Sequence, residues 1–109
     1  MLGYFTKYGD GAVDLEVIGG LFKTEELELA RYLKIPEKII RKTPTAELYR
    51  GQTDEEELGA SYKEIDGILG KIAKNQKLPN SKLAKKILRR IKGNEHKRMM
   101  PLVMQVSKK

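Results

Sequence analysis

Val13-Asp14-Leu15-Glu16-Val17 sets the expected fold class of this chain. Apolar and polar side chains alternate along it, and its valines are β-branched, which is typical of a short strand. Gly19-Gly20 ends the segment. A lone strand leaves its backbone groups unpaired, and even an isolated two-stranded hairpin is only marginally stable in water. We therefore predict a mainly α fold with one short strand, as in the C-terminal portion of an α/β protein whose other strands lie outside these residues.

Helical signals occupy much of the remaining sequence. Thr24 can begin a helix that Pro36 ends, and a short helix follows through Ile40. Ser61-Tyr62-Lys63-Glu64 has the pattern of a capping box and precedes an apolar stripe that runs to Gly70. The last helix starts at Asn80 or Ser81 and ends at Gly93, with its buried face expected at Leu83, Ala84, Ile87, Leu88 and Ile91.

A long loop is expected from Thr43 to Gly59, because no sustained period runs through it. Loops of this length in compact domains are usually functional or disordered. Its Asp54-Glu55-Glu56-Glu57 run could bind Mg²⁺, but neighbouring carboxylates rarely converge on one octahedral site. A solvated acidic loop is the favoured interpretation.

Composition excludes several classes of protein. The chain has 109 residues, no cysteine and one histidine. Disulfide scaffolds, thiolate zinc sites and polyhistidine metal sites are therefore excluded. No apolar run approaches a membrane span, and the N-terminus lacks the pattern of a secretory signal. We expect a cytoplasmic protein without a membrane segment.

The net charge of +7 is unevenly distributed. Residues 1–70 carry 9 Lys/Arg and 14 Asp/Glu, whereas residues 71–109 carry 13 Lys/Arg and one acid, Glu95. This asymmetry indicates an anionic partner near the C-terminus. The cations at 82–92 could form a nucleic-acid surface, but no aromatic residue is interleaved to stack on bases, so the solvated face of an amphipathic helix is favoured.

Three short motifs are candidates for ligand binding. Tyr4 to Gly11 places a lysine between aromatic residues and before a Gly-Asp-Gly turn, which permits close backbone approach or simply forms a surface turn. Gly19 to Thr24 does not fit a P-loop, because Phe22 stands where a glycine is needed, yet Lys23 at a helix start remains a possible phosphate contact. His96-Lys97-Arg98 suits an anion or forms a plain basic tail.

Taken together, these motifs resemble NAD synthetase, the family of ATP-dependent amide ligases that convert deamido-NAD to NAD. Four blocks in the family's order carry the resemblance: LGYFTKYGDGAVD at 2–14, GGLFKTEELELARYL at 19–33, TPTAELYRGQTDEEELGASY at 43–62, and NEHKR at 94–98. The resemblance covers the chain except for the stretch from about 71 to 92. After NEHKR, Met99 and Met100 precede Pro101, where the family has a further basic residue and two prolines.

The resemblance assigns roles to six residues. It implies contacts to deamido-NAD from Lys7, Asp14, His96 and Lys97. It implies contacts to ATP from Lys23 and Thr45. The implied co-substrates are ATP with Mg²⁺ and ammonia, and the nitrogen source, ammonia or glutamine, stays open. Neither the residues nor the resemblance identifies a catalytic side chain or a metal ligand within 1–109.

Only the C-terminal part of the family's chain is matched. The family's Ser-Gly-Gly-x-Asp-Ser loop, which cradles the pyrophosphate of ATP, and the parallel sheet that carries it, of the adenine nucleotide alpha hydrolase-like type, are not within 1–109. We therefore expect a single partial domain that is inactive alone, needs an N-terminal half or a second chain, and belongs to a homodimer. A non-catalytic binding or assembly module is the alternative, and a basic nucleic-acid-binding module is a more remote one.

Overall fold

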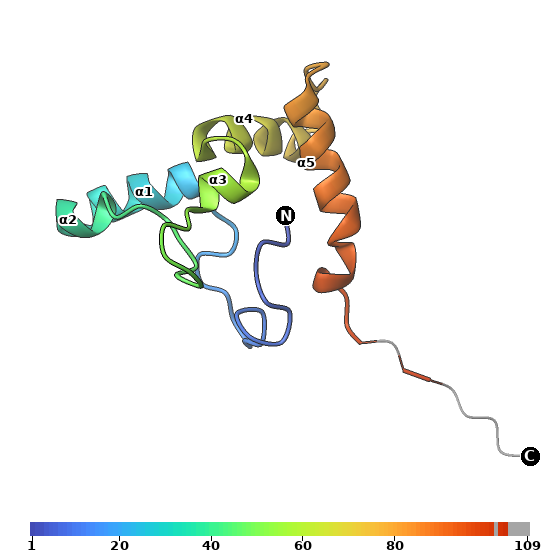
Figure 1. The fold of residues 1–109 in the computed structure, drawn as a ribbon, viewed down its shortest axis with the longest axis horizontal. Helices are drawn as coiled ribbons and strands as arrows, with labels where there is room; N and C mark the ends of the chain where they lie inside the picture. Colours follow the sequence, from blue (N-terminus) through green and yellow to red (C-terminus); the bar gives the residue numbers. More distant parts are fainter. Residues whose placement is uncertain (102, 105–109) are drawn as a thin grey trace, which may run out of the picture.

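The computed structural model describes residues 1–101 and 103–104, and these residues form helices joined by irregular segments (Figure 1). The helices are α1 (Lys23–Tyr32), α2 (Glu37–Ile40), α3 (Asp54–Leu58), α4 (Tyr62–Ala73), α5 (Lys82–Gly93) and the 3₁₀ helix η1 (Glu95–Arg98). In Figure 1, α4 lies across one end of α5, while α1 and α2 extend away on the opposite side. The fold is therefore helical over the described part of the chain.

Local capping signals set the starts of α4 and α5. The Ser61 hydroxyl accepts a hydrogen bond from the Glu64 N–H, and the Glu64 carboxylate accepts one from the Ser61 N–H at 3.1 Å, so the predicted capping box is confirmed. Ser81 accepts from the Ala84 N–H at 3.1 Å and begins α5. Such caps satisfy N–H groups that a helix leaves free, typically for about 1 kcal/mol.

The core forms where α3, α4 and α5 meet. Its buried members are Leu58 from α3, Ile65, Ile68 and Leu69 from α4, and Ala84 and Ile87 from α5. Ile65 is the most deeply placed large side chain, with 1% of its surface exposed. Of the face predicted for α5, Leu83 and Ile91 pack against this core, whereas Leu88 is 43% exposed. Burial of apolar surface at this junction holds the three helices together.

The predicted strand at 13–17 is wrong. Residues 12–20 form turns and irregular backbone, with the Glu16 carbonyl accepting from the Gly19 N–H at 3.1 Å. Val17 is 84% exposed. Within the described residues no second strand is present to supply the ladder, so the backbone forms local turns and the alternating apolar side chains face outward.

Helix α1 begins two residues earlier than the predicted N-cap at Thr24 implies. Phe22 is its N-cap, and the Glu25 carboxylate accepts from the Phe22 N–H at 2.8 Å. The half-buried Thr24 N–H donates at 2.8 Å to the carboxylate of Asp66, a buried residue of α4. This long-range bond attaches α1 to α4.

The region from 12 through α2, which we call the arm (residues 12–40), leaves much apolar surface exposed. Its exposed large apolar side chains are Val13, Leu15, Val17, Ile18, Leu21, Leu29, Tyr32, Leu33, Ile35 and Ile39. A contiguous stretch with so many exposed apolar side chains is characteristic of a surface that another part of a protein covers.

The expected long loop contains a helix. Thr53 caps α3 by accepting from the Glu56 N–H at 3.2 Å, and Gly59 ends it with a left-handed backbone, φ 75°. The residues Asp54 to Glu57 are therefore the first turn of a helix, where the macrodipole favours carboxylates. The irregular part of the loop shortens to 43–53, which we call the Thr45 loop.

Candidate functional site

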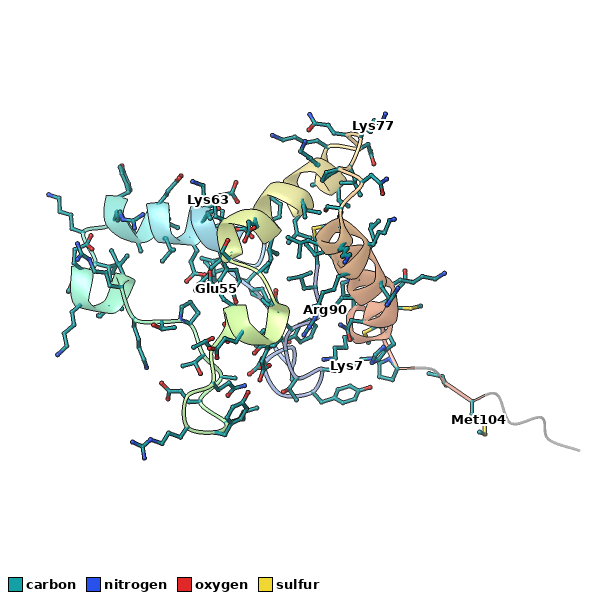
Figure 2. The ribbon with its side chains drawn as sticks, turned by 45° about the horizontal axis from the view of Figure 1, so that its top comes forward. Lys7, Glu55, Lys63, Lys77, Arg90 and Met104 are labelled. Atoms are coloured by element: carbon teal, nitrogen blue, oxygen red, sulfur yellow. The ribbon has the colours of Figure 1, made fainter. Side chains whose placement is uncertain are left out.

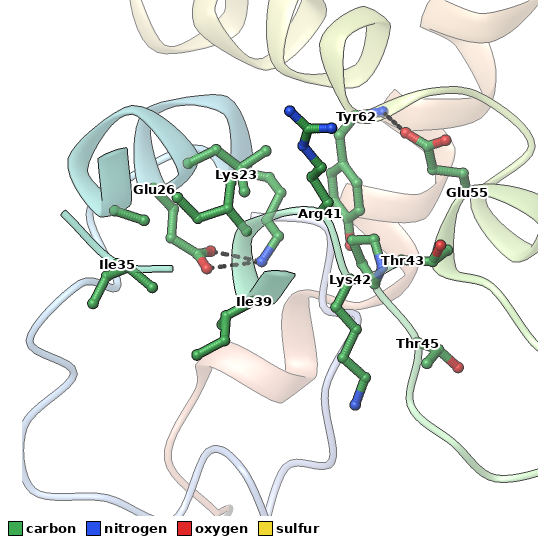
Figure 3. Close-up of a pocket in the computed structure, with 14 residues that line it drawn as sticks. Lys23, Glu26, Ile35, Ile39, Arg41, Lys42, Thr43, Thr45, Glu55 and Tyr62 are labelled. Carbon is green, nitrogen blue, oxygen red and sulfur yellow. Dashed lines mark hydrogen bonds and ion pairs between the residues drawn. The ribbon is translucent and has the colours of Figure 1, made fainter. Parts of the chain in front are cut away.

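One cavity of about 510 Å³ lies between α1, α2 and the start of the Thr45 loop (Figure 3). Both predicted ATP contacts line it: Lys23 at the start of α1, and Thr45. Arg41 and Lys42 add two more cations to the same wall, and Leu27, Ala30, Ile35, Ile39 and Ile40 form an apolar side. The structure therefore brings together Lys23 and Thr45, which are far apart in the sequence.

Within this cavity the ammonium of Lys23 is already engaged. It lies 2.8 Å and 2.9 Å from the two carboxylate oxygens of Glu26, one turn further along α1 (Figure 3). Both side chains are partly exposed. The backbone N–H groups of Phe22 and Thr24 are likewise taken by carboxylates, those of Glu25 and Asp66. An anion that enters here would compete with these carboxylates for the lysine.

Thr45 is held by its own loop. Its Oγ1 accepts from the Glu47 N–H at 3.0 Å, and the adjacent Pro44 carbonyl accepts from the Asp54 N–H at 3.0 Å. Accepting through Oγ1 leaves the hydroxyl proton of Thr45 available to donate to a ligand. Lys42 pairs with Glu47 at 2.7 Å, and this exposed pair lowers the pKa of Glu47 through the hydrogen bond and the charge of Lys42.

A second cavity, of about 670 Å³, lies between the N-terminal segment and η1. Two of the predicted dinucleotide contacts, Lys7 and Lys97, line it. The Lys97 ammonium donates to the carbonyls of Gly3 and Phe5 at 2.9 Å and 2.8 Å. The Lys7 ammonium donates to the His96 carbonyl at 2.7 Å. The two lysines thus join chain segments about ninety residues apart.

The other two predicted dinucleotide contacts do not line either cavity. His96 is exposed on η1, and its Nδ1 lies 3.1 Å from the Gly93 carbonyl oxygen, an acceptor that places the imidazole proton on Nδ1. Its backbone nevertheless meets Lys7. Asp14 lies at an exposed bend of the arm, between Ala12 and Glu16, which both line the second cavity.

Between the two cavities lies a network of phenols and carboxylates. The Tyr4 hydroxyl donates to Glu57 at 2.8 Å, and the Tyr62 hydroxyl donates to Asp54 at 2.8 Å. Burial and these carboxylates raise the pKa of Tyr4 to about 12 and also raise that of Tyr62. Hydrogen bonds from Tyr4, Gln52 and Tyr49 lower the pKa of Glu57. Both phenols therefore stay neutral at physiological pH.

Arg90 is the one cation of α5 that contacts this network. It points from α5 toward the N-terminal segment (Figure 2) and lies over the Tyr4 ring, 5.3 Å from its centroid. The remaining cations of the helix are exposed: Lys82, Lys85, Lys86, Arg89 and Lys92. This arrangement fits the solvated face predicted for α5.

Two further features concern metals and membranes. Among residues 1–101 and 103–104, no group of three or more histidine, aspartate or glutamate side chains is placed to hold a metal ion. None of the helices in that same part of the chain has the length and hydropathy needed to cross a bilayer.

Sequence reasoning missed several residues that shape these cavities. Arg41 and Lys42 directly precede the Thr-Pro-Thr of the third family block, and that proximity is a signal that could have suggested them. The roles of Asp66 and Glu57 were also missed, because Asp66 contacts Thr24 across 42 residues and Glu57 contacts Tyr4 across 53, and no local pattern marks such contacts.

Comparisons with known proteins match nearly the whole chain to one family. The family model described as NAD synthase matches residues 1–101. The chain is 50% identical over 106 residues to an NH(3)-dependent NAD(+) synthetase from Archaeoglobus fulgidus, covering 97% of this chain and 42% of the relative. A Methanosarcina acetivorans protein of the same name is 49% identical, with 97% and 44% covered.

A solved structure gives the same result. The structure of NMN synthetase from Francisella tularensis is 38% identical, superimposes with a TM-score of 0.78, and is matched over 96% of this chain and 42% of its own. The helical arrangement therefore matches a segment of that synthetase's fold. The chain belongs to the NAD synthase family, and it spans less than half the length of the relatives described.

Proposed function

We propose that this chain is part of an ATP-dependent ligase that amidates deamido-NAD to NAD with ammonia. The observation that carries the proposal is the division of the assigned lysines between two cavities: Lys23 with Thr45 in one, and Lys7 with Lys97 in the other. Two anionic co-substrates need two cationic sites, and the family's relatives are named as NH(3)-dependent NAD(+) synthetases.

The reaction has two steps. A nicotinate carboxylate oxygen attacks the α-phosphorus of ATP, forming an acyl-adenylate and releasing pyrophosphate. Ammonia then attacks the acyl carbon, AMP leaves with the bonding electron pair, and a proton is lost to give the amide. Both steps bring highly anionic groups together, so fixed cations and hydrogen-bond donors that neutralise this charge contribute strongly to the rate.

On the ATP side, Lys23 and Thr45 supply one cation and one hydroxyl donor. The Lys23 ammonium lies 2.8 Å from the Glu26 carboxylate. Phosphate oxygens of ATP would replace that carboxylate as its partner. The Thr45 loop, ordered by its own hydrogen bonds, can exclude water from the acyl-adenylate.

On the dinucleotide side, Lys7 and Lys97 face one cavity, and Arg98 also lines it. Lys97 uses two of its three protons on the Gly3 and Phe5 carbonyls, which leaves one for an anion. His96 and Asp14 join the substrate set by family resemblance, from the exposed positions described above.

The described residues do not form a complete Mg²⁺ site. The described residues present no suitable cluster of acids, so the metal that accompanies ATP would be held by the nucleotide and by groups outside this chain. The groups that bind the pyrophosphate of ATP would also lie outside this chain, because the family's Ser-Gly-Gly-x-Asp-Ser loop is not in this sequence.

The arm gives this chain a partner surface. Its exposed apolar side chains suit either the remaining part of the family fold or a second copy in a homodimer. Made alone, the chain is expected to self-associate or to be partly disordered. A compact monomer in sedimentation, with sharp cooperative unfolding, would contradict this expectation.

The test is an assay for AMP and amide product with ATP, Mg²⁺, ammonia and deamido-NAD. The 109-residue chain alone should show no turnover, because misplacement of reacting groups by about 1 Å can cost about a hundredfold. Adding a chain that carries the family's N-terminal half should restore turnover. Nicotinic acid mononucleotide belongs in the same assay, because the structural relative is named as an NMN synthetase.

Failure of complementation with intact binding of both nucleotides would favour the alternative, a non-catalytic binding or assembly module. A nucleic-acid module is tested separately. Binding to DNA or RNA should then fall with salt, with a slope set by the exposed cations of α5. Weak binding without preference over free nucleotides would remove that possibility.

A further inference from the structure

Three donors from separate positions converge on the carboxylate of Glu57. The Tyr4 hydroxyl donates to its Oε2 at 2.8 Å. The Tyr49 hydroxyl and the Gln52 amide donate to its Oε1 at 3.1 Å and 2.7 Å. Tyr4 belongs to the N-terminal segment, Tyr49 and Gln52 belong to the Thr45 loop, and Glu57 lies on α3. One carboxylate therefore joins three parts of the chain.

Gln52 extends the connection into the loop backbone. Its side-chain oxygen accepts from the Leu48 N–H at 2.8 Å, while its amide nitrogen donates to Glu57. Only 5% of the surface of Gln52 is exposed. A buried amide that loses its acceptor costs more than an exposed one, so Gln52 transmits the position of Glu57 to residue 48 and its neighbours.

Tyr4 extends the connection toward the second cavity. The carbonyls on either side of it, those of Gly3 and Phe5, both accept from Lys97. Lys7, three residues further on, is bonded to the His96 carbonyl. The segment that Glu57 holds through Tyr4 is thus the segment that carries the dinucleotide contacts.

We propose that Glu57 is a positioning residue that fixes the Thr45 loop relative to the segment carrying Lys7, and so holds the two substrate cavities in one arrangement. The meaning of this role for catalysis rests on the proposed function. The coupling itself rests only on the contacts of this chain.

Glutamate suits this role better than its neutral or shortened relatives. Its two ionised oxygens accept all three donors at once, whereas glutamine offers one acceptor oxygen and a competing donor. Alanine removes every bond. We therefore expect Glu57→Ala to loosen the Thr45 loop most and Glu57→Gln to loosen it less, relative to the wild-type chain.

The experiment is amide hydrogen exchange on the 109-residue chain, followed residue by residue. In Glu57→Ala, the Leu48 N–H should exchange about tenfold faster, the change expected when one hydrogen bond of ordinary strength is lost. Core amides of α4 should keep their rates. Glu57→Gln should recover part of the protection. Glu56→Ala, one residue away and without a side-chain hydrogen bond to the loop, is the matched control and should change nothing.

Two results would overturn the inference. One is random-coil exchange of the Leu48 amide in the wild-type chain. The other is an equal effect of Glu56→Ala and Glu57→Ala.

In the reassembled ligase, Glu57→Ala should raise KM for both ATP and deamido-NAD, whereas Lys23→Ala should raise only the KM for ATP. Loss of loop coupling in exchange and absence of any ligase activity are separate readouts, so failure of this inference is distinguishable from failure of the proposed function.

Discussion

Two regions of the chain, helices α4 and α5 on the one hand and the arm on the other, differ in how much of their apolar side chains is exposed. In the first region Ile65 is 1% exposed and packs with residues of α3 and α5. In the arm, Val17 is 84% exposed, and most of its large apolar neighbours are also exposed. The core side chains of the first region are buried by other residues of this chain. Most large apolar side chains of the arm are not covered by any of the described residues.

The largest expected difference is in stability. Ile65→Ala should destabilise the isolated chain by about 2–5 kcal/mol, because it leaves a cavity in the core. Val17→Ala should change stability by less than about 0.5 kcal/mol. Hydrogen exchange of the core amides of α4, which reports local opening without requiring one cooperative transition, checks both. If the two variants lost similar stability, the arm would be packed in solution in a way that this structure does not have.

The second expectation concerns the lysine that bridges the N-terminal segment and η1. In the reassembled ligase, Lys97→Ala should reduce kcat/KM for deamido-NAD by about 10- to 150-fold, because a charge-assisted hydrogen bond contributes about 1.5–3 kcal/mol. Steady-state kinetics with each substrate varied in turn measures this. An unchanged KM for the dinucleotide, together with a raised KM for ATP, would show that the assignment of Lys97 is wrong.

The third expectation is a pH dependence at the junction of the N-terminal segment and α3. The pKa of Tyr4 is raised to about 12 from an ordinary value of 10.0. A raised pKa in the folded state stabilises the fold fully below pH 10 and loses that contribution as the pH rises toward 12. Ultraviolet difference titration should therefore find a late-ionising tyrosine, and Glu57→Ala should move its pKa down. Ionisation of all tyrosines together near pH 10 would contradict the network.

The smallest expected effect is at the cavity that contains Lys23. Glu26→Gln releases the lysine from a partly exposed ion pair, and such pairs contribute about 0.2–1 kcal/mol. ATP binding to the reassembled ligase should tighten by up to about fivefold. Isothermal titration checks this, with Glu28→Gln on the exposed face of α1 as the control. Weaker ATP binding in Glu26→Gln would show that Glu26 assists the nucleotide.

The sequence predicted the starts of α4 and α5 from local signals. The capping box of Ser61 and Glu64 and the cap of Ser81 involve residues three apart, so their spacing alone contains the information. The strand at 13–17 failed for the opposite reason. Strand formation needs a partner at a distance, and alternation of apolar residues does not say whether that partner is present.

The candidate site divides in the same way. Family motifs supplied Lys7, Lys23, Thr45 and Lys97, and the fold then sorted them into two cavities. Position in the sequence could not indicate that Glu57 accepts from Tyr4, which lies 53 residues away. That contact depends on how distant segments pack together.

By itself, then, the amino-acid sequence determined the caps of α4 and α5, the apolar face of α4, the concentration of positive charge toward the C-terminus and the family. These follow from nearest neighbours and composition. Only the tertiary structure decided that 13–17 is not a strand, that Lys97 binds backbone carbonyls about ninety residues away, and that Glu57 accepts from Tyr4 of the N-terminal segment. Hydrogen bonds and burial between distant segments depend on how the chain packs in three dimensions, and the local pattern of residues does not contain that information.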